Sequence, residues 1–244
     1  MRSRDVAERG FVFVRPVRFN CLLFTSFFAF TPRIVSSIPR STMPRRIAVV
    51  GHSFVIKLEE YMRKNRDPDF RLRDTEVEYF GERGCKVYQL FEKTGEKVQK
   101  FNPDYIILMI GDNDIDCWNY LPGIAEAAIN QGIMLRRDNS VPVVICSVFP
   151  RYKALFEGAK YPLTPTYNER ARELNAIVAR KAATMRNFSV WTHTFASFPG
   201  PEEECPETKA YKRKRSLFSA DGTHLSPSGE NKLYRSMKLL VHGL

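Results

Sequence analysis

Residues 46–54 read RIAVVGHSF, a short apolar run that ends in glycine and is followed at once by a helical pattern. The run is typical of a buried strand, and Val55, Leu58 and Met62 recur after it at helical spacing. Ser53 therefore lies at a strand-to-helix junction. Two interpretations of its hydroxyl are open at this point: a cap for the amino terminus of the helix, or a nucleophile.

The same alternation of strand and helix continues to the end of the chain. We expect strands at 46–50, 75–80, 103–110, 141–149 and 188–192. We expect helices at 55–64, 87–101, 118–136, 167–186 and 226–241. The third helix is the weakest because Pro122 breaks its pattern, and 193–220 is expected to be a loop. Strict alternation predicts a parallel sheet covered on both faces, so one three-layer α/β/α domain accounts for residues 43–244.

Residues 1–42 differ in composition from the rest of the chain. They hold seven arginines and two acidic residues, so they carry +5 of the net charge of +11. Their best apolar run, at 21–30, is about half of the roughly 20 residues that cross a bilayer. We expect a poorly ordered leader or a targeting segment here. The location is expected to be intracellular (cytoplasmic), with a mitochondrial presequence and a secretory signal as alternatives.

The cysteines, one acidic run and the charge beyond residue 42 argue against several classes of protein. The five cysteines are scattered without CxxC spacing, which is typical of free thiols rather than a disulfide framework or a zinc site. The acidic run DNDID (112–116) begins like a calcium loop, but Cys117 and Gly123 stand where such a loop needs glycine and glutamate. We therefore expect neither a metal nor a cofactor. The charge of +6 beyond residue 42 is mildly basic and is weak support for a nucleic-acid partner.

Reactive side chains follow the predicted strands at the edge where ligands of parallel sheets bind. Ser53 follows the first strand, Gly84 the second and Asn113 the third, while Asp221 and His224 precede the last helix. This set provides a nucleophile, a backbone and a side-chain donor for an oxyanion, and a base with the carboxylate that orients it. The sequence therefore predicts an acyl-transfer site at this edge.

Each of these residues also has an ordinary structural interpretation. Ser53 alone would be a helix cap, His224 a hydrogen-bonded loop histidine and Asp221 a turn residue. Their occurrence together, in this order, favours a hydrolase site. Cys85 is a rival nucleophile on paper, but no base lies near it in the sequence, and a packed or exposed thiol is the better interpretation.

The motifs GHS, RGC, GDND and DGTH, in this order and at these distances, resemble those of the SGNH hydrolases, also called the GDSL-like lipase/acylhydrolase family, over about residues 45–241. The resemblance implies a flavodoxin-like fold with a five-stranded parallel sheet. It also implies a catalytic Ser53 with Asp221 and His224, and an oxyanion hole made by the Ser53 N–H, Gly84 and Asn113. Gly84 fits the spacing better than Gly81.

One position departs from the family pattern, because His52 stands where the family usually has aspartate. That position is supporting rather than catalytic, so the triad is intact while the hydrogen bonding around Ser53 must differ. The resemblance implies a serine esterase or acylhydrolase that cleaves an ester, thioester or acetyl group through an acyl-serine intermediate. The substrate would be a small-molecule, lipid or carbohydrate ester, and the oligomeric state stays open.

A second function of a different class is a non-catalytic module that binds nucleic acid. Its support is the basic run YKRKR (211–215), for which a solvated loop is the favoured interpretation. The intact triad argues against this alternative.

Overall fold

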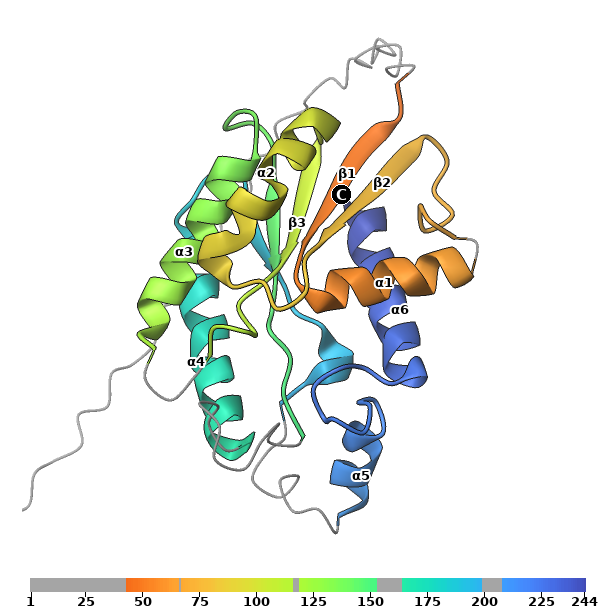
Figure 1. Cartoon of the computed structure of the whole chain (residues 1–244), viewed down its shortest axis with the longest axis vertical. Coiled ribbons are helices and arrows are strands. Elements are labelled where there is room, and N and C mark those ends of the chain that lie inside the picture. Colours follow the sequence, from red (N-terminus) through yellow and green to blue (C-terminus); the bar gives the residue numbers. More distant parts are fainter. Residues whose placement is uncertain (1–42, 66, 116–118, 153–163, 199–207) are drawn as a thin grey trace, which may run out of the picture. The chain divides into compact units, whose positions relative to one another are not determined.

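Five parallel strands form the centre of the fold, in the order β2-β1-β3-β4-β5 (Figure 1). The computed structural model describes residues 43–65, 67–115, 119–152, 164–198 and 208–244, all within one unit, Ser41–Leu244. The strands are β1 (Arg45–Gly51), β2 (Thr75–Gly81), β3 (Tyr105–Met109), β4 (Val143–Cys146) and β5 (Phe188–Trp191). This strand order is that of flavodoxin-like folds, which confirms the predicted fold class.

Helices cover both faces of the sheet. They are α1 (Ser53–Lys64), α2 (Leu90–Phe101), α3 (Leu121–Leu135), α4 (Thr164–Ala183), α5 (Lys209–Arg215) and α6 (Pro227–Gly243). Two 3-10 turns, η1 (Val87–Gln89) and η2 (Thr194–Ala196), lie in the connections. Helices α2, α3 and α4 lie on one face and α1 and α6 on the other, as Figure 1 shows.

The central strands are apolar on both sides because both of their faces are buried. In β1, Ala48 and Val50 point into the core under α2, α3 and α4, whereas Ile47 and Val49 point into the core under α1 and α6. All four side chains are fully buried. A continuous apolar run, rather than an alternating one, is therefore the correct signal for a central strand in this protein.

The register of the sheet places the predicted site residues at one edge. Gly51, the last residue of β1, pairs with Gly81 of β2 and with Met109 of β3. A Cβ atom at Gly51 would lie only 2.1 Å from the main-chain oxygen of Met109. Glycine at this position therefore allows β1 to end tightly against β3 and to turn directly into α1.

Two sequence predictions need correction. Pro122 does not break α3; the helix begins at Leu121, and proline occupies its first turn, where the missing N–H costs nothing. The segment 193–220 is not simply a loop, because η2 and α5 lie within it. The expectation for residues 1–42 lies outside the described residues.

Candidate active site

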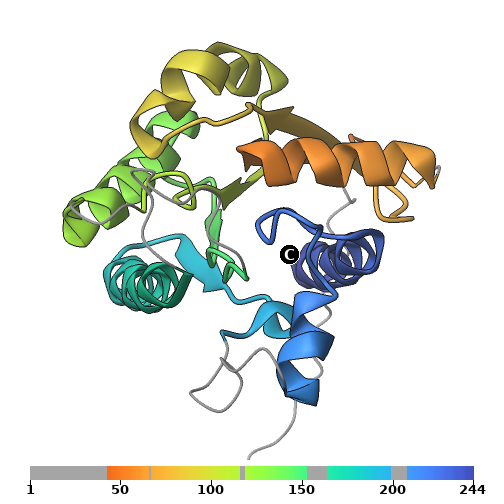
Figure 2. The same cartoon turned by 60° about the horizontal axis from the view of Figure 1, so that its bottom comes forward.

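Ser53 is the first residue of α1 and lies two residues after the end of β1. Figure 2 shows α1 in orange above α6 in blue. The N-cap of α1 is His52, whose side chain makes no capping hydrogen bond. The interpretation of Ser53 as a helix cap is therefore wrong. Its N–H belongs to the first turn, where amides lack a partner within the helix.

The Ser53 hydroxyl lies in a chain of hydrogen bonds that ends at a carboxylate. Ser53 Oγ is 3.2 Å from His224 Nε2, and His224 Nδ1 is 2.7 Å from Asp221 Oδ2. The His224 and Asp221 side chains are 39% and 37% exposed, so the base is open to solvent and to a ligand. The fold thus brings together the three residues that the sequence predicted for a triad, although 171 residues separate Ser53 from His224.

Asp221 is held by donors from its own loop. Its Oδ1 accepts hydrogen bonds from Ser219 Oγ at 2.6 Å and from the N–H groups of Thr223 at 2.8 Å and His224 at 2.9 Å. Partial burial alone would raise the pKa of the Asp221 carboxyl. The hydrogen bonds from Ser219, the His224 ring and these amides outweigh burial and hold the pKa well below its usual range. Asp221 is therefore ionised and fixed in orientation.

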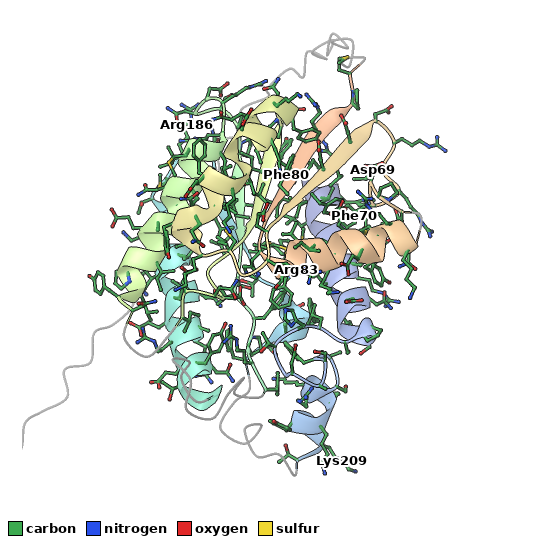
Figure 3. The ribbon with its side chains drawn as sticks, viewed as in Figure 1. Asp69, Phe70, Phe80, Arg83, Arg186 and Lys209 are labelled. Carbon is green, nitrogen blue, oxygen red and sulfur yellow. The ribbon has the colours of Figure 1, made fainter. Side chains whose placement is uncertain are left out.

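Gly84 and Asn113 follow β2 and β3, the two strands that flank β1 in the sheet. Gly84 has φ +64°, in the region that favours glycine, and it is exposed (Figure 3 labels its neighbour Arg83). Asn113 Nδ2 donates to the main-chain oxygen of Cys85 at 3.1 Å. A carboxamide nitrogen has two hydrogens, so Asn113 retains a second donor for a ligand oxygen.

Gly81 and Cys85 have packing roles. A Cβ atom at Gly81 would lie 2.5 Å from Cγ1 and 2.9 Å from the main-chain nitrogen of Ile56, so glycine is needed where β2 meets α1. The Cys85 thiol is buried and bonds the main-chain oxygen of Lys86. Burial raises its pKa to about 11, so the thiolate is scarce at neutral pH and Cys85 is a poor nucleophile.

Asp114 is a supporting residue that the sequence analysis did not single out. Its carboxylate accepts the Val87 N–H at 3.2 and 3.1 Å and so holds the start of η1, two residues after Cys85. Burial raises the pKa of Asp114 to about 6. Its position directly after Asn113 in the motif GDND was the available signal.

His52, the departure from the family pattern, has a partner of its own. His52 Nε2 is 2.9 Å from Asp112 Oδ2, and these side chains are only 1% and 9% exposed. Asp112 Oδ1 accepts the Phe149 N–H at 3.1 Å. The sequence pointed to altered hydrogen bonding at His52 but not to Asp112, because sixty residues separate the two and only the β1–β3 register joins them.

The basic run at 211–215 forms most of α5, which begins at Lys209 (Figure 3). Tyr211 Oη donates to the main-chain oxygen of Tyr152 at 3.1 Å, and Lys214 Nζ lies 3.4 Å from that of Phe198. The expectation of a solvated loop is therefore wrong, since part of this run packs against the domain.

In the part of the chain that the structure describes, no three His, Cys, Asp or Glu side chains gather as metal ligands. No helix in the same part has both the length and the apolar composition to cross a bilayer.

The comparisons with known proteins concern the fold and the family. Solved structures that share the fold include a Streptococcus pneumonia protein whose name refers to platelet activating factor (21% identity, 84% of this chain and 86% of that chain, TM-score 0.56). A lipase/acylhydrolase from Enterococcus faecalis (16%, 82% and 96%, TM-score 0.54) and a GDSL-like lipase from Bacteroides thetaiotaomicron (16%, 82% and 88%, TM-score 0.54) share it too. No curated protein matches the chain.

A model of the family described as GDSL-like Lipase/Acylhydrolase matches residues 52–237, a span that runs from His52 almost to the end of α6. The span includes every residue of the site described above. The chain therefore belongs to the GDSL-like lipase/acylhydrolase family of hydrolases.

Proposed function

We propose that this protein is a serine esterase or acylhydrolase that cleaves an ester, thioester or acetyl group through an acyl-serine intermediate. The observation that carries the proposal is the chain of hydrogen bonds from Ser53 Oγ through the His224 ring to Asp221. A hydroxyl, an imidazole and a carboxylate in this order are the parts that nucleophilic acyl transfer requires.

In the first half of the reaction, Ser53 Oγ attacks the acyl carbonyl carbon while His224 Nε2 takes the hydroxyl proton. Asp221 keeps the proton of His224 on Nδ1 and stabilises the imidazolium. The tetrahedral intermediate collapses, the bond to the alcohol or thiol breaks, and His224 returns the proton to the leaving group. The acyl group is then an ester of Ser53.

In the second half, water replaces the alcohol. His224 Nε2 accepts a proton from the water, the hydroxide attacks the acyl-serine, and the proton passes to Ser53 Oγ as the carboxylic acid departs. The exposure of His224 supports this step, because water reaches the ring directly.

The oxyanion in both halves would be held by the Ser53 N–H, the Gly84 N–H and the second Nδ2 hydrogen of Asn113. The contact between Asn113 Nδ2 and Cys85 O supports this assignment, because it fixes the carboxamide beside the Gly84–Cys85 segment. One such donor contributes about 3–4 kcal/mol to transition-state stabilisation.

The substrate class that we propose is a small-molecule, lipid or carbohydrate ester. We further propose that residues 43–244 form the hydrolase domain, that 1–42 are a leader or targeting segment, and that the enzyme acts in the cytoplasm. The contacts of Tyr211 and Lys214 weaken the alternative of a nucleic-acid module, because they direct part of the basic run toward the protein.

The test compares wild type, Ser53→Ala and a control variant, Ser140→Ala, with a fluorophosphonate probe and a series of p-nitrophenyl esters. Ser140 is exposed and lies before β4, at the opposite edge of the sheet. We expect Ser53→Ala to abolish labelling and to lower turnover at least about 10³-fold, with Ser140→Ala unchanged. Equal labelling of Ser53→Ala and wild type would overturn the proposal.

A further inference from the structure

The loop that joins α5 to α6 carries both Asp221 and His224, and its main chain is closed by a few short contacts. The Ser219 N–H donates to the His224 oxygen at 2.7 Å, and the Ser226 N–H donates to the Leu217 oxygen at 2.9 Å. Phe218 and Leu225 form an isolated antiparallel bridge. These contacts close the loop on itself, and the Gly222 N–H also donates to the Ser219 oxygen at 3.0 Å.

Arg215, the last residue of α5, binds three main-chain carbonyls of this loop. Its Nη1 donates to the main-chain oxygens of Phe218 at 2.9 Å and Ser219 at 2.7 Å, and its Nη2 donates to that of Ala220 at 3.1 Å. The three acceptors are consecutive and directly precede Asp221. One guanidinium can do this because its donors form a rigid planar fork.

The contacts of Arg215 connect to Ser53 through an unbroken series of hydrogen bonds. Arg215 holds the main chain of Ser219, whose Oγ donates to Asp221 at 2.6 Å. Asp221 in turn holds the His224 ring, which faces Ser53 Oγ. A shift of the 218–220 main chain would therefore move the base relative to the nucleophile.

We propose that Arg215 is a positioning residue that fixes the Asp221–His224 loop by binding the main-chain oxygens of Phe218, Ser219 and Ala220; its effect on turnover rests on the proposed hydrolase function. Arg215 touches no reacting atom. Its positive charge also offsets the partial negative charges of three carbonyl oxygens that converge on one point. This assigns a role in the site to one of the basic residues of the run 211–215.

The chain offers a matched control on the same helix. Arg213 is exposed, two residues before Arg215, and has the same charge. The variants to compare are Arg215→Gln, Arg215→Lys and Arg213→Gln. The first removes charge and fork, the second keeps the charge without the fork, and the third removes an equal charge from the same helix.

Arg215→Gln is expected to lower kcat for a p-nitrophenyl ester about 10–100-fold, the effect of a misplaced catalytic group, with little change in KM. Labelling by the fluorophosphonate should slow by a similar factor, and Arg215→Lys should recover part of the loss. Arg213→Gln should match wild type in all these measurements. Thermal melting of each variant shows whether it is folded at the assay temperature.

A second measurement does not depend on activity. The Thr223 and His224 amides donate to Asp221, so their hydrogen exchange reports whether the loop is held. We expect faster exchange at these two amides in Arg215→Gln and not in Arg213→Gln. Unchanged exchange, unchanged kcat, or an equal loss in Arg213→Gln would overturn the role of Arg215. If wild type shows no Ser53-dependent turnover while exchange still responds to Arg215→Gln, the proposed function fails and the positioning of the loop stands.

Discussion

Among the described residues, two hydrogen-bonded histidine–aspartate pairs differ in exposure: His224 with Asp221, and His52 with Asp112. His224 and Asp221 are each more than a third exposed, whereas His52 and Asp112 are less than a tenth exposed. Both pairs have short contacts, of 2.7 and 2.9 Å. The two pairs have the same side-chain types, but His224 contacts its carboxylate through Nδ1 and His52 through Nε2, and their surroundings differ.

The difference shows why one pair suits proton transfer and the other suits structure. His224 has a hydroxyl on one nitrogen and a carboxylate on the other, with solvent in reach. His52 has Asp112 on Nε2 and no hydrogen-bond partner at Nδ1, which is buried. The inner pair is closed off from solvent, and it joins the end of β1 to the segment after β3.

The largest expected effect comes from the outer pair. Asp221→Asn keeps the size of the side chain but loses control of the His224 tautomer, so kcat should fall about 10³–10⁴-fold. Steady-state kinetics and urea unfolding together test this. A variant that keeps more than about a tenth of the wild-type kcat would show that Asp221 does not orient the base.

A smaller effect, on stability rather than chemistry, is expected at the inner pair. His52→Asp installs the residue that the family usually has, yet it places a second carboxylate beside the buried Asp112. We expect the free energy of unfolding to fall by about 3 kcal/mol near pH 7. Part of the loss should return near pH 5, because one of two facing carboxyls then takes up a proton. Urea titrations at the two pH values measure both effects.

Two companion variants separate charge from shape at this site. In His52→Gln the side-chain amide can still donate to Asp112, so most of the stability should remain. In the double variant His52→Asp with Asp112→Asn, one donor and one acceptor face each other again, and stability should return near pH 7. If His52→Asp alone is as stable as wild type, the inner pair does not hold the strands together.

The smallest effect concerns Asp114, whose pKa is raised to about 6 by burial. The folded protein binds a proton at Asp114 more tightly than the unfolded chain does, so the stability that Asp114 contributes is fully present below about pH 4 and is lost as the pH rises toward 6. The decline should be of order 2 kcal/mol. Asp114→Asn should remove it, because the neutral amide does not titrate and its oxygen can still accept the Val87 N–H.

Thermal or urea unfolding of wild type and Asp114→Asn between about pH 4 and pH 7 decides this prediction. Parallel curves for the two proteins would mean that Asp114 titrates alike in the folded and unfolded states. Unfolding curves of His52→Asp over the same pH range give a comparison. That variant also gains stability on acidification, but through the carboxyls at positions 52 and 112 rather than through Asp114.

The fold and the outer pair could be predicted from the sequence because their signals are local. The central strands contain continuous apolar runs, β2 alternates, and Asp221 and His224 are three residues apart. Ser53 follows an apolar run directly. What joins these pieces is the parallel sheet, whose carboxyl ends meet at one edge.

The inner pair and the helix α5 could not be predicted in the same way. Asp112 lies beside His52 only because β1 and β3 are neighbours, a long-range relation that no local pattern records. The basic run from Lys212 to Arg215 suggested a solvated loop, since charge indicates exposure but not which carbonyl groups a side chain reaches. For this reason the contacts of Arg215 could not be predicted from the sequence.

The hydrogen bonds from Arg215 to the loop have a consequence for protein engineering. It acts on main-chain oxygens, which every amino acid has, so it makes no demand on the side chain at Ala220, which is exposed. Substitutions at Ala220 can therefore introduce new side-chain contacts one residue from Asp221, while Arg215 still binds the main chain of the loop. We therefore expect substitutions at Ala220 to be tolerated, because Arg215, five positions earlier, binds the main-chain oxygen there.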